Sequence, residues 1–347
     1  MTVDASIAAP PSREHRRNQR FTDLKYRWPA RYRASWAALV LVVLGAAIVA
    51  PSALSSASIT LVTALAGVLA LAAFGQVLIV MIGAIDLSIS AIVSVAAGMM
   101  VHYADSGANV WVLALCAMGV AVLLSLVNGF LIVILQLNAL IVTLATVGMM
   151  IGLIQLWTGV ALSSTGKAPR ALVDFADSDH FSINTVFIVA VIVGSALAFF
   201  LTSTRAGKSI AFAGSNPRAA EVLGIRVRAV KLMVFALAGL LYGLAGVLLA
   251  GYVRTPDVLS GTIYQLLAIT VAGVAGVLFT GGPASMSSVI SSCLFLVLLD
   301  QVLSVKGMGA GARVVIQGLV LAIAVAAITI GQLGATRLSK LRRRRSG

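Results

Sequence analysis

Residues 34–85 read ASWAALVLVVLGAAIVAPSALSSASITLVTALAGVLALAAFGQVLIVMIGAI, without a single Asp, Glu, Lys or Arg. A helix needs about 20 apolar residues to cross the hydrocarbon of a bilayer. This stretch is therefore long enough for two membrane spans, with a turn predicted near Pro51–Ser58. Because backbone polar groups find no water within lipid, these spans are expected to be helices.

We apply the same criterion, a long stretch without Asp, Glu, Lys or Arg, to the whole chain. It predicts about ten spans, and hence an all-α integral membrane protein. Leu87–Val101 is short for a full crossing. The other stretches are Ser106–Gly166, with two spans hinged at Gln136–Asn138; His180–Thr204 and Leu232–Val253, with one each; Val258–Leu299, with two spans broken around Thr280–Pro283; and Val314–Thr336, with one.

Composition excludes an ordinary soluble protein. Of the 347 residues 60% are hydrophobic and 10% are charged, whereas a soluble domain has roughly 25% charged residues. Two cysteines, Cys116 and Cys293, lie in apolar runs and form neither a disulfide framework nor a metal motif. The N-terminal tail is too long and too charged for a typical signal peptide, so the first apolar run is expected to be retained.

The net charge of +14 is gathered in three basic blocks, Arg13–Arg33, Arg205–Lys231 and Arg337–Arg345. Basic blocks that flank apolar stretches orient membrane proteins and favour anionic lipid headgroups, so binding of nucleic acid is not expected. With ten spans all three blocks face the cytoplasm, whereas nine spans would place one basic tail outside. We therefore expect a multi-pass protein with both termini cytoplasmic.

This arrangement divides the chain into three parts. A basic cytoplasmic tail covers residues 1–34, a transmembrane domain covers 35–336, and a second basic tail covers 337–347. The transmembrane domain is interrupted by a cytoplasmic loop at 203–231, which holds the middle basic block.

The sequence offers no catalytic or metal site. His15, His102 and His180 lie far apart, and no His, Cys, Asp and Glu cluster has metal-ligand spacing. The segment Ala206–Ser209 ends like a phosphate-binding loop, but Thr202 stands where that motif needs its first glycine. We therefore expect no enzyme activity and no cofactor in this chain, and any ATP must be bound by another subunit.

The loop at 203–231 predicts a short helix. Asn216 can cap a helix that begins at Pro217, and Gly224 suits the left-handed residue that ends it. A helix over Pro217–Leu223 is too short to be stable alone, so it needs a partner surface. That surface is either its own helical bundle or another subunit, and the local sequence leaves both open.

Four segments, in chain order, resemble the monosaccharide importer permeases of the ATP-binding cassette (ABC) class, the ribose-permease family. They are FGQVLIVMIGAIDLSISAIVSVAAG from Phe74, NGFLIVILQLNALIVTLATVGMMIGL from Asn128, GSNPRAAEVLGIRVRAVKLMVFALAGLLYGLAGVLLAG from Gly214 and GTIYQLLAITVAGVAGVLFTGGPASM from Gly261. The third of these is similar to the family's cytoplasmic coupling loop and the helix that follows it. Together the similar segments cover most of residues 74–320.

The resemblance implies a type II importer permease fold in the bacterial inner membrane. It also implies a second permease copy, identical or different, two ATPase subunits that bind ATP and Mg²⁺, and a periplasmic binding protein. The solute would be a monosaccharide or a related small polar molecule. The short helix would be the coupling helix that docks on the ATPase, through Asn216, Pro217, Arg218, Ala219, Glu221, Leu223 and Gly224.

Polar residues within the spans are candidates for the solute path. Asp86 and Asp300 are the acidic residues closest to membrane depth, where a charge costs roughly 2.5–3.5 kcal/mol on insertion scales. Asp86 is interpreted as the N-cap of a span that starts at Leu87. Asp300 either binds sugar hydroxyls or lies solvated at the outer interface. The predicted path residues are Gln76, Asn128, Asp300 and Gln301.

The sequence leaves the solute open. Where the ribose-permease family often has Asn-Asn and further polar residues, this chain has Asp300, Gln301 and Ser304. An ABC permease for branched-chain amino acids or nucleosides is one alternative, although an amino acid would require paired charges. A stand-alone secondary transporter or channel is another, and that class couples through intramembrane ionisable residues. Only Asp86 and Asp300 could serve, and no buried Lys, Arg or His partner is expected for either.

Overall fold

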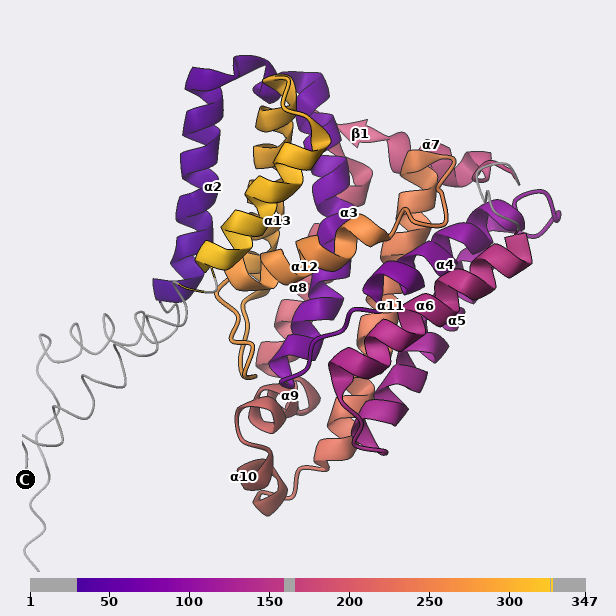
Figure 1. Ribbon diagram of the computed structural model, residues 1–347, viewed down its shortest axis with the longest axis vertical. Coiled ribbons are helices and arrows are strands. Elements are labelled where there is room, and N and C mark those ends of the chain that lie inside the picture. Colours follow the sequence, from indigo (N-terminus) through magenta and orange to yellow (C-terminus); the bar gives the residue numbers. More distant parts are fainter. Residues whose placement is uncertain (1–29, 159–165, 325, 327–347) are drawn as a thin grey trace, which may run out of the picture.

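The computed structural model describes residues 30–158, 166–324 and 326, and the chain forms a bundle of helices (Figure 1). The two basic tails lie largely outside the described residues, as does the end of the span predicted over 314–336. The elements are α2 (Ala30–Val49), η1 (Pro51–Leu54), α3 (Ser56–Met81), α4 (Ile89–His102), α5 (Val110–Val133), α6 (Ala139–Thr158), α7 (Arg170–Asp177), β1 (Asp179–His180), β2 (Ile183–Asn184), α8 (Thr185–Ser203), α9 (Arg205–Ser215), α10 (Pro217–Val222), α11 (Val227–Val253), α12 (Thr262–Val274), α13 (Met286–Val305) and a last helix, Ala310–Ala324.

The described residues contain seven helices that are long and apolar enough to cross a membrane: α2, α3, α5, α6, α8, α11 and α13. Three shorter apolar helices, α4, α12 and Ala310–Ala324, bring the apolar helices to the ten that the sequence predicts. The all-α membrane fold is therefore confirmed. The short charge-free stretch at Leu87–Val101 forms α4, and this helix begins two residues later than expected.

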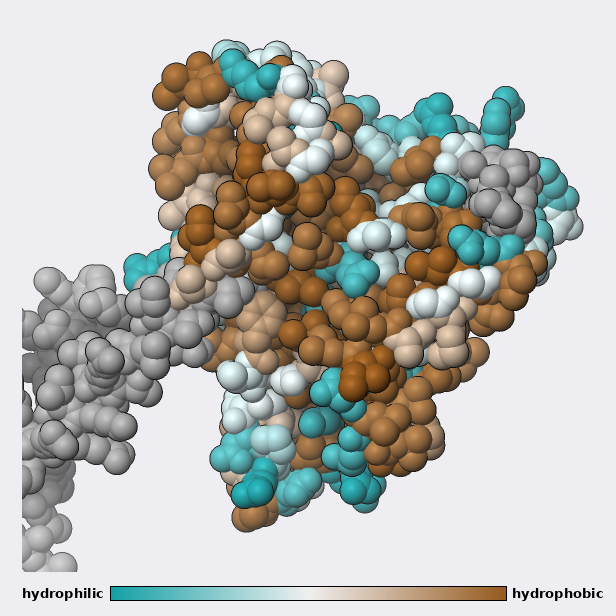
Figure 2. All heavy atoms as spheres, viewed as in Figure 1, coloured by the Kyte–Doolittle hydropathy of each residue, from teal (hydrophilic) through white to brown (hydrophobic). Residues whose placement is uncertain are grey.

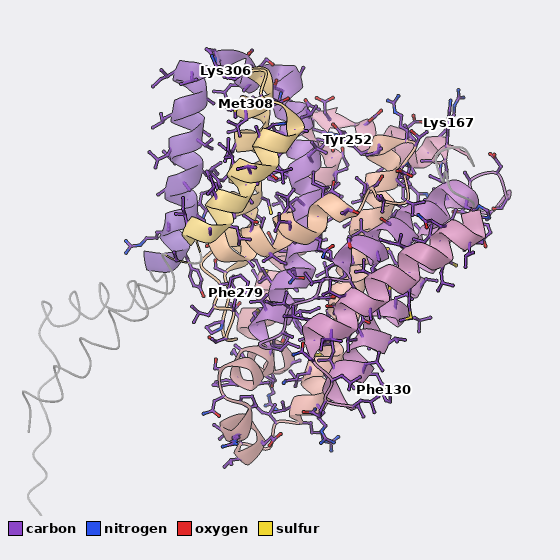
Figure 3. All side chains as sticks on the ribbon, viewed as in Figure 1. Phe130, Lys167, Tyr252, Phe279, Lys306 and Met308 are labelled. Carbon is purple, nitrogen blue, oxygen red and sulfur yellow. The ribbon has the colours of Figure 1, made fainter. Side chains whose placement is uncertain are left out.

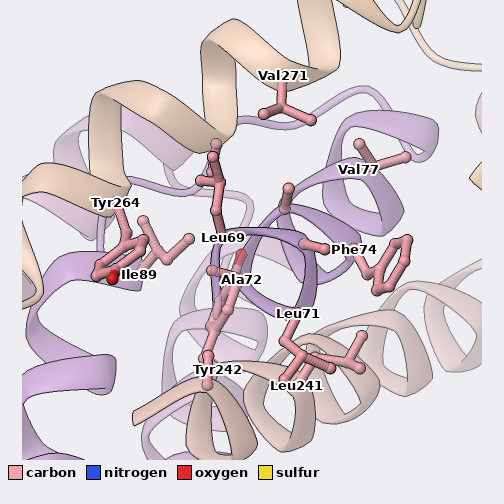
Figure 4. Packing of buried hydrophobic residues seen from close by; sticks show 14 of the residues in the cluster. Leu69, Leu71, Ala72, Phe74, Val77, Ile89, Leu241, Tyr242, Tyr264 and Val271 are labelled. Carbon is pink, nitrogen blue, oxygen red and sulfur yellow. The ribbon is translucent and has the colours of Figure 1, made fainter. Parts of the chain in front are cut away.

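Helix α3 lies at the centre of the bundle. It is buried along almost its whole length, and α8, α11, α12 and α13 pack around it. Figure 4 shows this packing, with Tyr242 of α11 and Val271 of α12 on different sides of α3. A helix that is apolar all round is stable only where other helices or lipid cover every face, which explains why α3 has no polar side.

Helix α11 approaches α5 closely because two glycines face it. A Cβ built on Gly239 would lie 2.7 Å from the carbonyl oxygen of Ala121, and one on Gly243 would lie 2.8 Å from the Ala121 Cβ. Such a small-xxx-small pair lets two helix backbones come together within a membrane, where association depends on close packing.

Polar residues gather at two ends of the molecule, with an apolar belt between them (Figure 2). Helix α10 is at one end, and Lys167 and Lys306 are at the other (Figure 3). Two polar ends separated by an apolar belt are expected of a protein whose ends meet water and whose middle meets lipid.

Candidate functional site

The predicted short helix exists as α10, and its local structure is as expected. The Asn216 side-chain oxygen accepts a hydrogen bond from the Ala219 N–H at 3.1 Å, and Pro217 is the first helical residue. Gly224 has a φ of +79°, the left-handed conformation that ends a helix. The helix ends at Val222, one residue earlier than predicted.

One side of α10 packs on the protein and the other side is free. Ala220 is buried against Ala213 of α9 and Val227 of α11. Val222 and Leu223 are 87% and 71% exposed. The structure thus combines both readings of the sequence: α10 is anchored to its own bundle through a single small side chain, and its apolar edge is left uncovered in this chain.

Helix α9, which the sequence analysis did not predict, joins α10 to the membrane domain. At its end, a Cβ built on Gly214 would lie 1.7 Å from the carbonyl oxygen of Met81, the last residue of α3. The same oxygen accepts a hydrogen bond from the Gly282 N–H at 2.9 Å. The end of α9, the end of α3 and the α12–α13 connection therefore meet at one point, directly behind α10.

Beyond Met81 the chain leaves the helix for the segment 82–88 and then forms α4, which begins beside α11 (Figure 1). Non-helical backbone at membrane depth requires partners within the protein. Gln76 provides them for Asp86: with its amide oriented to satisfy both groups, its nitrogen donates to the Asp86 carbonyl oxygen at 2.8 Å and its oxygen accepts from the Asp86 N–H at 3.3 Å. The Tyr242 hydroxyl lies 3.3 Å from the same amide.

The Asp86 side chain faces inward as well. One carboxylate oxygen, Oδ1, accepts from the Ser88 N–H at 2.8 Å and from the Ser88 hydroxyl. The Ser88 oxygen in turn accepts from the side-chain amide of Asn128 on α5 at 2.8 Å. We name these residues the buried polar cluster; all are fully buried: Gln76, Asp86, Ser88, Asn128 and Tyr242.

The interpretation of Asp86 as an N-cap needs correction. Helix α4 begins at Ile89, so the cap position falls on Ser88, whose side chain makes no capping bond. Asp86 does accept from one nearby backbone N–H, that of Ser88. The prediction placed the helix start two residues too early. The contacts with Gln76 hold the preceding segment out of the helix, and the local sequence gives no signal of them.

The four predicted path residues fall into two groups. Gln76 and Asn128 both belong to the buried polar cluster. Asp300 and Gln301 lie near the C-terminal end of α13. There the Asp300 carboxylate accepts hydrogen bonds from Arg313 at 2.7 Å and from Gln317 at 3.1 Å. Gln301 donates to the Ser58 hydroxyl at 3.2 Å. The path assignment of these four residues stays a prediction.

Asp300 has the basic partner that the sequence analysis did not expect. The side chains of Arg313 and Asp300 are only 25% and 34% exposed, so the pair is partly shielded from solvent. A charge of either sign so near the apolar belt is costly unless it is paired. The spacing of 13 residues, across a turn between two helices, gave no local signal of this contact.

Comparison with known proteins identifies the fold's biological class. Residues 58–325 match the protein family described as branched-chain amino acid transport system / permease component. The chain belongs to this permease family. The match spans α3 to the last helix, and so includes the buried polar cluster, α9 and α10.

This permease is also similar to curated import permeases. It is 28% identical over 272 residues to the autoinducer 2 import system permease protein LsrC of Escherichia coli O9:H4 (strain HS), covering 77% of this chain and 78% of that protein. It is 27% identical over 272 residues to the protein of the same name from Salmonella paratyphi B, covering 77% of each chain. No solved structure matches it significantly.

The permease is therefore a multi-pass inner-membrane subunit of an ABC importer, as the sequence resemblance implies. Permeases of this class normally lack an ATPase site of their own and in general work with ATPase and solute-binding partners. Within residues 30–158 and 166–324, no three or more His, Cys, Asp or Glu side chains come together as metal ligands would.

Proposed function

We propose that this permease moves a monosaccharide or a related small polar solute into the cell, with a periplasmic protein delivering the solute. The relatives named for autoinducer 2 import support a small polar solute over the branched-chain amino acids of the family description. The charges in the spans support it too. Asp300 and Arg313 neutralise each other, and Asp86 has no basic partner, so no separate pair of charges is free for an amino acid zwitterion.

We further propose that a separate ATPase subunit drives transport and that it binds this permease through α10. The observation that carries this proposal is the exposed apolar edge of Val222 and Leu223 on a helix that is capped, short and anchored at a polar end of the molecule. Exposed apolar side chains on such a helix favour docking into a groove of a partner. Arg218 and Glu221, also exposed, flank that edge and suit a polar rim.

The close contact behind α10 gives this docking a route into the bundle. Because Gly214 lies against Met81 without an intervening side chain, a movement of α9 and α10 is transmitted directly to the end of α3. A rigid-body movement of this kind is a common way in which two packed elements switch between states. The second permease copy would supply the opposite half of the solute path.

Substitution of the exposed edge tests the coupling proposal. We expect the double variant Val222→Ser, Leu223→Ser to reduce co-purification with the ATPase at least about tenfold, because burying each side chain contributes about 1.5–3 kcal/mol. Phe181→Ser is the matched control, since Phe181 is fully exposed and directly follows β1, which lies at the opposite end of the molecule from α10 (Figure 1). Undiminished association of the double variant, or solute accumulation by this chain alone in liposomes, would contradict the proposal.

The proposed orientation places α10 and both termini in the cytoplasm. Single cysteines introduced on a Cys116→Ser background test it, because Cys116 is exposed and Cys293 is buried. A membrane-impermeant thiol reagent applied to intact spheroplasts should label Lys306→Cys and leave Arg218→Cys unlabelled. The reverse pattern would show that α10 faces the periplasm, where no ATPase could reach it.

A further inference from the structure

The buried polar cluster contains two oxygen atoms without a hydrogen-bond partner. They are Oδ2 of Asp86 and the side-chain oxygen of Asn128, and both residues are completely buried. An acceptor that is removed from water and left without a donor is destabilising, and an ionised carboxylate far more so. These two atoms therefore indicate a missing donor within the cluster.

Most of the protein's own donors near the cluster are already committed. The Ser88 hydroxyl and N–H both donate to Oδ1 of Asp86, and the Asn128 amide donates to Ser88. The Gln76 amide binds the backbone of Asp86, and in that orientation its nitrogen also faces the Tyr242 oxygen, which accepts there; the Tyr242 proton is the one donor of the cluster not committed to Gln76. Neither unpartnered oxygen has a hydrogen-bond donor, that of Tyr242 included, among the residues that the structure describes.

The cluster also lacks a positive charge. The ion pairs of the described residues are Arg254 with Asp177 and Arg313 with Asp300, both remote from Asp86 in the chain and on other elements. Tyr242 is the one other titratable group of the cluster, and it is neutral in its ordinary form. An ionised Asp86 would thus be a buried charge with no counter-charge, in a part of the molecule surrounded by apolar helices.

We propose that Asp86 binds a proton on Oδ2 and is held as a neutral carboxylic acid, with this proton directed to the Asn128 oxygen, either directly or through one buried water. A single proton removes both defects, because it converts Oδ2 from acceptor to donor and cancels the charge. The Ser88 hydroxyl already joins the two side chains, since it donates to Oδ1 of Asp86 and accepts from the Asn128 amide.

A bound metal cation would explain the two unpartnered oxygens less well than a proton does. Ca²⁺ takes six to eight oxygen ligands and Mg²⁺ demands a near-octahedral set. The cluster offers two unpartnered side-chain oxygens, and the described residues hold no group of acidic side chains to complete such a shell. The proton requires one donor position and one acceptor, and the cluster supplies both.

The position of this proton site matters for the proposed transport cycle, on which this step rests. Asp86 lies five residues after Met81, the residue against which α9 packs, and in the non-helical segment that must change if α3 and α4 move apart. A neutral cluster can open and close without exposing an unpaired charge to apolar surroundings. The proton is thus a bound structural ligand and is not carried with the solute.

Infrared spectroscopy of the purified importer complex in lipid nanodiscs tests the protonation directly. The difference spectrum of wild type minus Asp86→Asn should show the C=O stretch of a carboxylic acid, with a downward shift in D₂O. Wild type minus Asp300→Asn is the matched control and should instead show carboxylate bands, because Asp300 is ion-paired. Carboxylate bands in the Asp86 difference spectrum would overturn the proposal.

Wild-type protein alone provides a second measurement, which remains valid if Asp86→Asn does not fold. Its carboxylic acid band should be present at neutral pH and should move to higher frequency in Asn128→Leu, which removes the acceptor. Absence of the band in wild type would overturn the proposal, as would stabilisation of wild type by sodium over choline.

Transport by the assembled complex gives the functional readout. Asp86→Asn, a neutral isostere, should keep the uptake rate within about threefold of wild type, whereas Asp86→Ala should lose most uptake. Equal loss in both variants would show that the charge is needed and would contradict a neutral Asp86. Because the infrared bands do not depend on the ATPase, failure of the coupling proposal and failure of this one are distinguishable.

Discussion

Gly214 at the end of α9 and Met81 at the end of α3 touch backbone to backbone. A Cβ on Gly214 would come within 1.7 Å of the Met81 carbonyl oxygen, a separation that no pair of real atoms allows. The neighbouring Gly281 has a φ of +96° and approaches the Gly214 carbonyl oxygen, so three backbone segments meet where one side chain would separate them. This contact fixes the position of the end of α9, from which the chain enters α10, relative to the membrane bundle.

Gly214→Ala should therefore disturb coupling more than its small volume suggests. The added methyl group forces α9 away from α3, and overpacking of this kind costs typically 1–3 kcal/mol. We expect a lower melting temperature and a loss of solute-stimulated ATP hydrolysis by the assembled complex. Gly119→Ala on α5 is the control, since a Cβ there has open space and should lower neither quantity. Equal effects of the two substitutions would contradict this role of the contact.

Asn216 should contribute to ATPase binding through the stability of α10. Asn216→Ala removes the acceptor for the Ala219 N–H, and loss of an N-cap typically costs about 1 kcal/mol. We expect the affinity for the ATPase to fall roughly fivefold, measured by titration of the ATPase onto the permease in nanodiscs. Asn216→Asp keeps a good cap and should bind as wild type does; weak binding by both variants would assign Asn216 a direct contact instead.

Gln76 should matter more to stability than the neighbouring Tyr242 hydroxyl. Gln76→Leu leaves both the N–H and the carbonyl group of Asp86 buried without partners, and each such group costs about 1–3 kcal/mol. Tyr242→Phe removes one hydroxyl that contacts only the Gln76 amide among the described contacts, so its cost should be about 1 kcal/mol. Thermal unfolding in detergent measures the difference; a larger effect of Tyr242→Phe would mean that the Gln76 contacts are dispensable.

The pair of Asp300 and Arg313 should stabilise the contact between α13 and the last helix by a modest amount. Both side chains are partly exposed, so we expect a coupling energy of about 1 kcal/mol, reduced by salt. A double-mutant cycle with Asp300→Ala and Arg313→Ala, read by thermal unfolding at two salt concentrations, measures it. If uptake falls in Asp300→Asn while stability does not, Asp300 also serves the solute path.

The elements that the sequence predicted well are those with a one-dimensional signal. The charge-free stretches located all ten apolar helices, because a membrane span must be long and apolar whatever its neighbours are. The ends of α10 were predicted to within one residue, because Asn216, Pro217 and Gly224 each favour a specific backbone conformation. Helix α9 was not predicted, because Gly207 and Gly214 lie within it and glycine is unfavourable in a helix interior.

The sequence by itself thus determined that this protein spans a membrane, how many apolar helices its described residues contain and where the short capped helix lies, since each follows from the chemistry of consecutive residues. Only the tertiary structure decided that Gln76, Asp86 and Asn128 share one buried network, and that Asp300 is paired with Arg313. Apart from the local bonds between Asp86 and Ser88, these contacts join residues 10 to 166 positions apart in the buried polar cluster and 13 apart at the ion pair. Their partners are chosen by how helices pack in three dimensions, and no local pattern of residues encodes that choice.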